Sequence, residues 1–186
     1  MIVLTGVPRA GKTTLGRKLA SILHVPFYDL DELVLKRCAS SYPRIDSLRT
    51  LVQLYGETAL RTVEKEEIAF LQKCKEGVLA LGGGTLLGDI TLSEMFPKGL
   101  YLHLSLSFPE FLKRILVKQL PSTCAIKTSW HPALLEFYQA RYDAAAASSH
   151  HTINVYTDVA YGVSSNGGTV LEKIIMHIPA SMQKRE

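Results

Sequence analysis

The chain has 186 residues and a formal net charge of +4 at pH 7, and 47% of its residues are hydrophobic. This composition indicates a globular protein with a sizeable core. The scatter of basic among acidic residues excludes the charge pattern of a nucleic-acid-binding protein. We expect a monomer with a single domain over residues 1–186, which contains a small mobile insertion.

Cysteine usage and hydropathy set further limits. Three widely spaced cysteines, Cys38, Cys74 and Cys124, argue against a disulfide framework or a paired-cysteine zinc site and favour a reducing compartment. No apolar run approaches the length of about 18 residues that a membrane-spanning helix needs. The first predicted strand begins at once, which leaves no room for a signal or transit peptide. We therefore expect a cytoplasmic protein with no membrane partner.

Apolar runs and helical periodicities alternate along the chain. Strands are predicted over residues 2–5, 26–29, 78–81, 100–104 and 151–155. Helices are predicted over residues 12–23, 31–38, 46–75 with a break near Gly56, 107–118, 133–147 and 168–178. This alternation predicts an α/β fold in which helices cover both faces of a parallel sheet. Residues 119–132 are predicted to form a surface loop, and the residues after Pro179 a polar, frayed tail.

The first predicted strand leads into a glycine-rich loop. Residues 6–13, GVPRAGKT, match the phosphate-loop spacing G-x-x-x-x-G-K-[ST], and an amphipathic helix follows. The glycines allow successive N–H groups to turn toward a phosphate, and the helix N-terminus adds a partial positive charge. Lys12 is expected to reach the β- and γ-phosphate oxygens of a nucleotide, and the Thr13 hydroxyl to ligate Mg²⁺. The predicted nucleotide-binding residues are Gly6, Arg9, Ala10, Gly11, Lys12, Thr13 and Thr14.

Two carboxylates, Asp29 and Asp31, follow the second predicted strand. Ligands of parallel sheets bind beyond the carboxyl ends of the strands, so this pair is expected to face the same crevice as the phosphate loop. One carboxylate can hold Mg²⁺, directly or through water, while the other accepts a hydrogen bond from an attacking hydroxyl. The alternative is that the pair caps the N-terminus of a helix, where acidic residues are favoured.

Two further clusters follow along the chain. Arg61 lies one helical turn from Glu57 and from Glu64, which predicts either a surface ion pair or a guanidinium presented to a substrate carboxylate. Residues 82–84, three consecutive glycines, end the third predicted strand. Such a run is costly in conformational entropy, and we expect it where the backbone approaches a ligand closely.

The segments GVPRAGKTTLG, FYDLDELV, GETALRTVE and LALGGGTLL, followed more loosely by ALLEFYQARYDAA, resemble the shikimate kinase family in this order. The resemblance runs from residue 1 to about residue 155. It implies a P-loop NTPase fold of the nucleoside-monophosphate-kinase type, with a five-stranded parallel sheet and a mobile lid over about residues 119–132. It also implies an ATP-dependent kinase that transfers the γ-phosphoryl group to the 3-hydroxyl of shikimate. The products are ADP and 3-phosphoshikimate, on the route to chorismate and the aromatic amino acids.

The resemblance also implies roles for single residues. Lys12 and Asp31 would be catalytic, with Asp31 as the base, and Thr13 and Asp29 would hold the Mg²⁺ that accompanies ATP. Arg114 would flank the adenine ring. The implied shikimate-binding residues are Asp31, Arg61, Gly82, Gly83, Gly84 and Arg141.

The chain departs from the family's pattern in the lid. Family members usually carry an arginine before a proline there, whereas this chain has His131 before Pro132, with Lys127 as the nearby obligate cation. Loss of that guanidinium would slow transfer unless Lys127 or Arg9 replaces its charge. Arg9 is itself unusual, because a small residue is common at its position. The interpretation we favour is that its side chain points into solvent.

Two alternatives to a shikimate kinase stay open at the level of the sequence. The first is a P-loop kinase for another acceptor, such as gluconate or a nucleoside monophosphate, against which Arg61 and the glycine run argue. The second is a nucleotide-binding protein with weakened catalysis. The missing lid arginine supports this second alternative, and the otherwise complete set of site residues opposes it.

Overall fold

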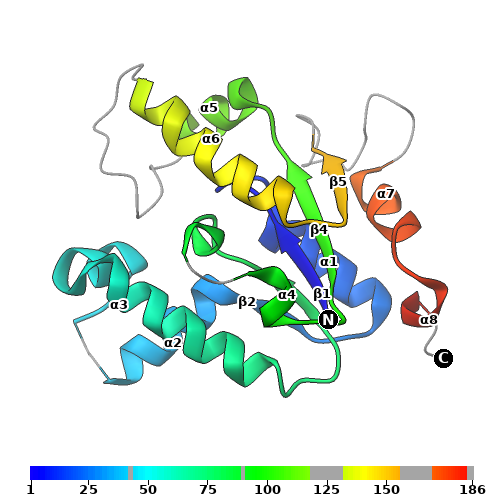
Figure 1. Ribbon diagram of the computed structural model, residues 1–186, viewed down its shortest axis with the longest axis horizontal. Helices are drawn as coiled ribbons and strands as arrows, with labels where there is room; N and C mark the ends of the chain where they lie inside the picture. Colours follow the sequence, from blue (N-terminus) through cyan, green and yellow to red (C-terminus); the bar gives the residue numbers. More distant parts are fainter. Residues whose placement is uncertain (42–43, 89–90, 118–131, 156–168, 184–186) are drawn as a thin grey trace.

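The computed structural model of the chain describes residues 1–41, 44–88, 91–117, 132–155 and 169–183 (Figure 1). Five parallel strands form one sheet in the order β2-β3-β1-β4-β5. The strands are β1 (Ile2–Thr5), β2 (Phe27–Asp29), β3 (Val78–Ala80), β4 (Leu100–Ser105) and β5 (His151–Asn154). All five predicted strands are present, and their parallel pairing confirms the expected fold class.

Helices connect the strands. They are α1 (Lys12–Leu23), α2 (Leu30–Ser41), α3 (Leu48–Leu71), α4 (Leu92–Met95), α5 (Phe108–Val117), α6 (Pro132–Ala147), α7 (Val170–Met176) and α8 (Ala180–Gln183). A single 3-10 turn, η1 (Thr85–Leu87), follows β3. Every helix that the sequence predicts is found, with ends that differ by a few residues.

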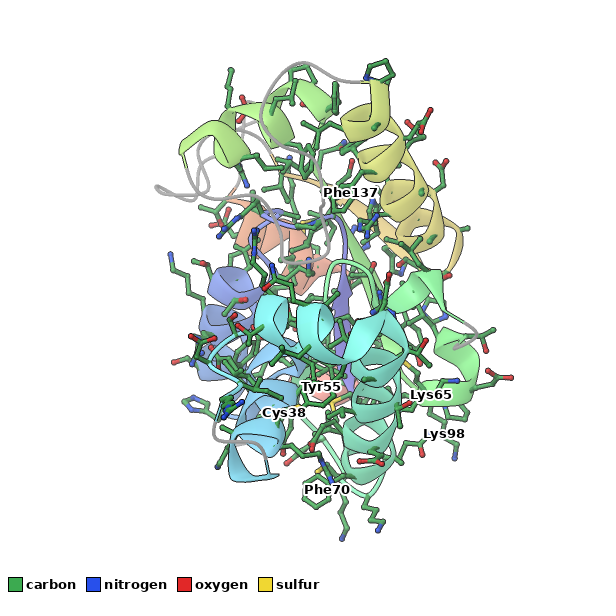
Figure 2. All side chains as sticks on the ribbon, turned by 90° about the vertical axis from the view of Figure 1, so that its left-hand side faces the viewer. Cys38, Tyr55, Lys65, Phe70, Lys98 and Phe137 are labelled. Atoms are coloured by element: carbon green, nitrogen blue, oxygen red, sulfur yellow. The ribbon has the colours of Figure 1, made fainter. Side chains whose placement is uncertain are left out.

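Each face of the sheet has its own hydrophobic core, because successive residues of a strand point to opposite faces. In β1, Leu4 packs with apolar side chains of α1, α5, α6 and α7. Val3 packs on the other side with side chains of α2, α3 and α4, among them the buried Cys38 of α2 (Figure 2). All residues of β1 are buried, which explains why this strand is uniformly apolar in sequence. The sheet is therefore covered on both faces, as expected.

Helix α3 contains the break that the sequence indicates at Gly56. This glycine has φ 80° and ψ 170°, a non-helical conformation inside the helix that few side chains tolerate. Ser47 caps the start of the helix, and its hydroxyl accepts a hydrogen bond from the backbone N–H of Thr50 at 3.1 Å. Leu48 before the kink and Leu60 after it both line the same cavity. The kink thus lets one helix contribute two walls to a single site.

Three short elements, η1, α4 and α8, are absent from the sequence-based prediction. Helix α4 has a readable signal, because Thr91 and Glu94 form a capping box at its start. The prediction of a frayed tail after Pro179 is wrong for Ala180–Gln183, which form α8. The Gln183 side-chain amide donates to the carbonyl oxygens of Ile175 and Ile178 at the end of α7. Local sequence does not reveal this contact, because it depends on how α8 folds back.

Two further expectations from the sequence concern membrane-spanning helices and the lid. Within the described ranges, no helix has the length and apolar character that crossing a membrane requires. The predicted lid, residues 119–132, lies outside the described residues except for Pro132, which begins α6. His131 and Lys127, the two residues that bear on the lid's missing arginine, also lie outside them.

Leu104 of β4 is fully buried in the same hydrophobic core as Leu4. Truncating its side chain therefore tests where that core lies. We expect Leu104→Ala to lower the free energy of unfolding by about 2–5 kcal/mol, through lost contacts and the cavity left behind. The matched control is Leu135→Ala in α6, where the side chain is 46% exposed. It is expected to change the free energy of unfolding by about 0.5 kcal/mol or less. Urea unfolding measures both, and equal losses in the two variants would contradict the placement.

Candidate active site

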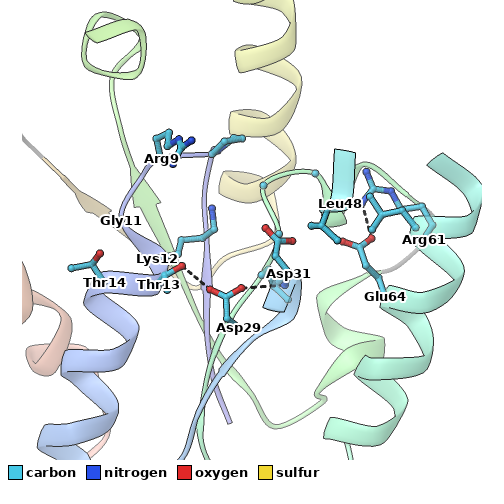
Figure 3. A pocket seen from close by; sticks show the side chains of 16 residues that line it. Arg9, Gly11, Lys12, Thr13, Thr14, Asp29, Asp31, Leu48, Arg61 and Glu64 are labelled. Atoms are coloured by element: carbon cyan, nitrogen blue, oxygen red, sulfur yellow. Dashed lines mark hydrogen bonds and ion pairs between the residues drawn. The ribbon is translucent and has the colours of Figure 1, made fainter. Parts of the chain in front are cut away.

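A cavity with a volume of about 460 Å³ lies where β1, β2 and β3 end (Figure 3). It is lined by Pro8, Arg9, Gly11, Lys12, Thr13, Thr14, Asp29, Asp31, Leu48, Leu60, Arg61, Glu64, Leu81, Gly82, Gly83 and Gly84. Most residues predicted for the site therefore line one cavity. Gly6 and Arg141 line a small adjoining cavity together with Gly82 and Gly83. Ala10 is buried behind the loop.

The phosphate loop has the backbone that its glycines predict. Gly6 and Gly11 have φ values of 137° and 95°, and α1 begins directly after Gly11. A Cβ at Gly6 would lie 2.6 Å from the carbonyl oxygen of Leu104, so the loop also passes too close to β4 for a side chain. Arg9 adopts a positive φ of 68° without being a glycine. Its side chain is exposed, as the sequence interpretation favours, and it also lines the cavity.

Lys12 lies in the first turn of α1, and its side chain reaches across to the start of the phosphate loop. Its Nζ donates hydrogen bonds to the carbonyl oxygens of Gly6 at 2.8 Å and Val7 at 3.0 Å. The residue is 8% exposed, and burial lowers the pKa of its ammonium to about 8, against the attraction of Asp31 and Asp29. The side chain is therefore a cation held at the centre of the loop by the loop's own carbonyls, where nucleotide phosphates are expected.

Asp29 joins the phosphate loop to the end of β2. The Thr13 hydroxyl donates to one carboxylate oxygen of Asp29 at 2.6 Å. The other oxygen accepts the backbone N–H groups of Asp31 at 3.1 Å and Glu32 at 3.3 Å, at the start of α2. The helix-cap and metal-site interpretations are thus compatible, because different oxygens of one carboxylate serve them. A hydroxyl beside a carboxylate suits Mg²⁺, which takes few protein ligands and completes its shell with phosphates and water.

Asp31 lies on the cavity side of α2, between Lys12 and the glycine run (Figure 3). A Cβ at Gly82 would lie 2.6 Å from its Oδ1, so the backbone of residue 82 abuts the carboxylate. The residue has contact with solvent through the cavity, yet the surrounding protein displaces enough water from the carboxylate to raise its pKa to about 6. The negative charge of Asp29 adds to this rise, and Lys12 opposes it. Such a pKa suits a general base near neutral pH.

Arg61 satisfies both interpretations that the sequence leaves open. Its guanidinium donates to Glu64 at 2.6 Å and to Glu57, which makes the predicted ion pairs one turn away in each direction. The same side chain is 14% exposed and lines the cavity. A Cβ at Gly84 would lie 2.9 Å from its Nη2. The ion pairs therefore hold a half-buried guanidinium against the glycine run rather than on an open helix surface.

Glu64 is a site residue that the sequence analysis does not select. It is 2% exposed, lines the cavity, and accepts hydrogen bonds from Arg61 and from the Thr85 hydroxyl, the latter at 2.7 Å. A readable signal exists, because Glu64 is four residues after Leu60 and four before Ile68, on the buried face of α3. A carboxylate on an apolar face requires hydrogen-bond partners. The partners of Glu64 are Arg61 and Thr85, so this carboxylate also holds the Arg61 side chain in place.

Arg141 approaches the same glycine run from α6. It is 9% exposed, donates to the carbonyl oxygen of Phe137 at 3.1 Å, and stacks on the Phe137 ring at 3.5 Å from the centroid. A Cβ at Gly84 would lie 3.6 Å from its guanidinium and 2.9 Å from that of Arg61, so both arginines approach residue 84 at the same point. Tyr142 fixes this part of α6 through a 3.0 Å hydrogen bond to Ser105 of β4.

Arg114 of α5 lies at the other end of the site. Its Nη1 donates to the carbonyl oxygen of Arg9 at 2.9 Å, which places it beside the phosphate loop rather than in the wall of the cavity. This position is on the nucleotide side of the site, where the adenine-flanking role would require it. The adenine-flanking role of Arg114 stays a prediction.

Comparisons with known proteins identify relatives of this chain. The family model described as shikimate kinase matches residues 8–178. Curated shikimate kinases match at 31% identity in Chlamydia pneumoniae, over 64% of this chain and 66% of the relative. The shikimate kinase of Rhodococcus jostii strain RHA1 is 35% identical over 60% of this chain and 62% of the relative. That of Clostridium botulinum strain Okra is 30% identical over 76% of this chain and 80% of the relative. The matches thus span somewhat less than two thirds of the first two relatives.

Solved structures share the fold. Shikimate kinase from Aquifex aeolicus has a TM-score of 0.72 at 23% identity, covering 94% of this chain and 93% of that one. Shikimate kinase from Acinetobacter baumannii, solved in complex with shikimate, has a TM-score of 0.71 at 22% identity, covering 94% and 90%. The P-loop kinase fold expected from the sequence is thereby confirmed.

The raised pKa of Asp31 predicts a pH-dependent effect on stability. The folded protein holds this proton more tightly than the unfolded chain, in which the pKa of an aspartate is about 3.9. The group therefore stabilises the fold fully below about pH 4, and the stabilisation is lost as the pH rises through about 6. Asp31→Asn, which cannot ionise, is expected to gain stability relative to the wild type between those pH values. Urea unfolding at both pH values measures the gain.

Asp46→Asn is the control of opposite sign. Hydrogen bonds from Thr50 and Ser47 lower the pKa of the Asp46 carboxyl, so its contribution to stability is present above the unfolded pKa and lost in acid. This variant is expected to lose stability relative to the wild type as the pH rises. The same sign of change in the two variants would refute the assignment for Asp31.

Proposed function

The chain belongs to the shikimate kinase family, and we propose that it transfers the γ-phosphoryl group of ATP to the 3-hydroxyl of shikimate. One observation carries this proposal. A single cavity joins a phosphate loop, through Asp31, to a wall that bears the half-buried Arg61. The nucleotide and an anionic hydroxyl compound would thus meet at one carboxylate, which is what direct transfer between them requires.

The loop side of the cavity would bind the nucleotide. Backbone N–H groups of the loop and of the N-terminus of α1 would donate to phosphate oxygens, and Lys12 would supply a cation beside them. The Thr13 hydroxyl and the Asp29 carboxylate would hold Mg²⁺, with Asp29 acting through water. When bound, Mg²⁺ neutralises charge on the phosphates and orients them.

The opposite side of the cavity would bind the acceptor. Arg61 presents a planar guanidinium that suits a carboxylate, and the Arg141 guanidinium lies near it beside Gly84. Asp31 would accept a hydrogen bond from the attacking hydroxyl and take its proton as the bond to phosphorus forms. A carboxylate with a pKa of about 6 is ionised at neutral pH and is a stronger base than an ordinary aspartate.

The expected setting of the protein also remains a proposal. Cys38 is buried and Cys74 half-buried, and both are free thiols, which suits the reducing cytoplasm. We propose a monomer there, because the cavity obtains loop, base and arginine from one chain.

The direct test measures ADP release from Mg²⁺ and ATP with and without shikimate. We expect release that depends on shikimate in the wild type and background release in Lys12→Ala, which removes the cation of the phosphate loop. Gluconate and a nucleoside monophosphate serve as competing acceptors. Turnover with one of these instead of shikimate would transfer the proposal to another acceptor. Tight ATP binding without turnover on any of them would replace it with nucleotide binding alone.

Arg61→Lys tests the acceptor side. An ammonium cannot make the bidentate pair with a carboxylate, so the KM for shikimate is expected to rise about 10-fold or more while the KM for ATP changes little. Arg37→Lys is the matched control, because Arg37 also pairs with two glutamates, Glu66 and Glu67, but lies outside the cavity. An unchanged KM for shikimate in Arg61→Lys would mean that Arg61 has a structural role only.

A further inference from the structure

Arg9 combines an unfavourable backbone with a place in the cavity wall. Among the described residues, Arg9 and His24 are the non-glycine residues with positive φ, at 68° and 54°. His24 is the C-cap of α1, where this conformation is common. Arg9 has no such setting, because it lies in the middle of the phosphate loop between Pro8 and Ala10. Glycine would adopt the same backbone without strain, so the arginine side chain has a conformational cost that a function would offset.

The strained backbone is held by the fold. Arg114 of α5 donates a hydrogen bond to the carbonyl oxygen of Arg9 at 2.9 Å, and the Ala10 N–H donates to the carbonyl oxygen of Val7 at 3.2 Å. Both bonds hold the peptide unit between Arg9 and Ala10, which follows the Arg9 Cα. The direction in which the side chain leaves the loop is therefore set before any ligand binds.

The position of Arg9 complements the other charges of the cavity. In the part of the wall that the structure describes, the cationic side chains are Arg9, Lys12 and Arg61. Arg61 is paired with two glutamates on the acceptor side, whereas Arg9 belongs to the loop, with Lys12 and Asp31 between the two arginines (Figure 3). Arg9 is thus the guanidinium on the side where a nucleotide's terminal phosphate would meet the acceptor, and its exposed side chain has room to turn toward it.

We propose that Arg9 is a catalytic residue whose guanidinium contacts the γ-phosphoryl group during transfer. The inference rests on the proposed kinase function and adds a residue to it. In the reaction, the acceptor oxygen forms a bond to the γ-phosphorus as the bond to the bridging oxygen breaks, and ADP leaves with that electron pair. Asp31 takes the hydroxyl proton. Arg9 donates hydrogen bonds to the equatorial oxygens, where negative charge accumulates, and transfers no proton.

Three substitutions separate the charge of Arg9 from its backbone strain. Arg9→Gly removes both the guanidinium and the strain. Arg9→Asn removes the charge and keeps a residue that tolerates positive φ. Arg9→Lys keeps a charge and the strain but loses the planar fork. The control is Arg17→Asn in α1, because Arg17 is an exposed arginine that pairs with Glu32 outside the cavity.

The expected results differ between activity and stability. We expect kcat to fall about 100-fold or more in Arg9→Gly and Arg9→Asn, and about 10-fold in Arg9→Lys, with little change in the KM for shikimate. The melting temperature of Arg9→Gly is expected to rise by about 2–4 °C, because the strain is relieved. Arg17→Asn should keep the wild-type kcat. A kcat within about threefold of the wild type in Arg9→Asn would overturn the proposal, since loss of one such contact costs about 100-fold or more.

A binding measurement separates failure of this inference from failure of the proposed function. Calorimetry with Mg²⁺ compares the affinity for ADP alone with that for ADP plus aluminium fluoride, which mimics the transferring phosphoryl group. We expect the Arg9 variants to bind ADP as the wild type does and to lose about 10-fold or more of the affinity that aluminium fluoride adds. If the wild type shows no turnover with shikimate, the proposed function is wrong. The comparison of affinities with and without aluminium fluoride still decides the role of Arg9. Equal gains in wild type and variants would refute the contact.

Discussion

The hydrogen bond from the Thr13 hydroxyl to the Asp29 carboxylate joins the two halves of the site. It links the phosphate loop after β1 to the end of β2, although β3 lies between those strands in the sheet. The chain leaving β3 must therefore pass through a narrow space beside this bond. A Cβ at Gly82 would meet Asp31 at 2.6 Å, and one at Gly83 would meet the Pro8 ring at 2.5 Å. The consecutive glycines are a steric consequence of bringing the carboxylates and the phosphate loop together.

Charge in the cavity is organised around groups from which the surrounding protein displaces water. Lys12 and Asp31 have pKa values displaced toward each other, to about 8 and about 6, because this loss of water disfavours the charged form of each. Glu64 is nearly inaccessible, yet hydrogen bonds from Arg61 and Thr85 satisfy it. This network positions Arg61 before a ligand arrives. Such preorganisation is what phosphoryl transfer needs, since positioning and electrostatics supply most of its catalysis.

The predictability of the site differs from residue to residue. The phosphate loop is readable because its function depends on local backbone geometry, which glycine spacing reveals. The sequence places Asp29 in the site but presents the helix cap and the metal site as alternatives. In the structure, one oxygen of Asp29 caps α2 while the other accepts from Thr13. The spacing of Glu64 from Arg61 predicts an ion pair, and its position on the apolar face of α3 also signals burial. The positive φ of Arg9 has no signal in the residue type itself, because it follows from the closure of the loop and the contact with Arg114.

The sequence by itself determined the α/β class, the five strands, the helices longer than one turn, and the phosphate loop. These features depend on periodicity and on residue types within short windows, where local energetics dominate. Tertiary structure alone decided the strand order β2-β3-β1-β4-β5 and, with it, which loops meet. It also decided that Arg61 and Arg141, eighty positions apart in the chain, come together beside one glycine, Gly84. Packing between distant segments sets such contacts, and no local pattern encodes which segments will pack.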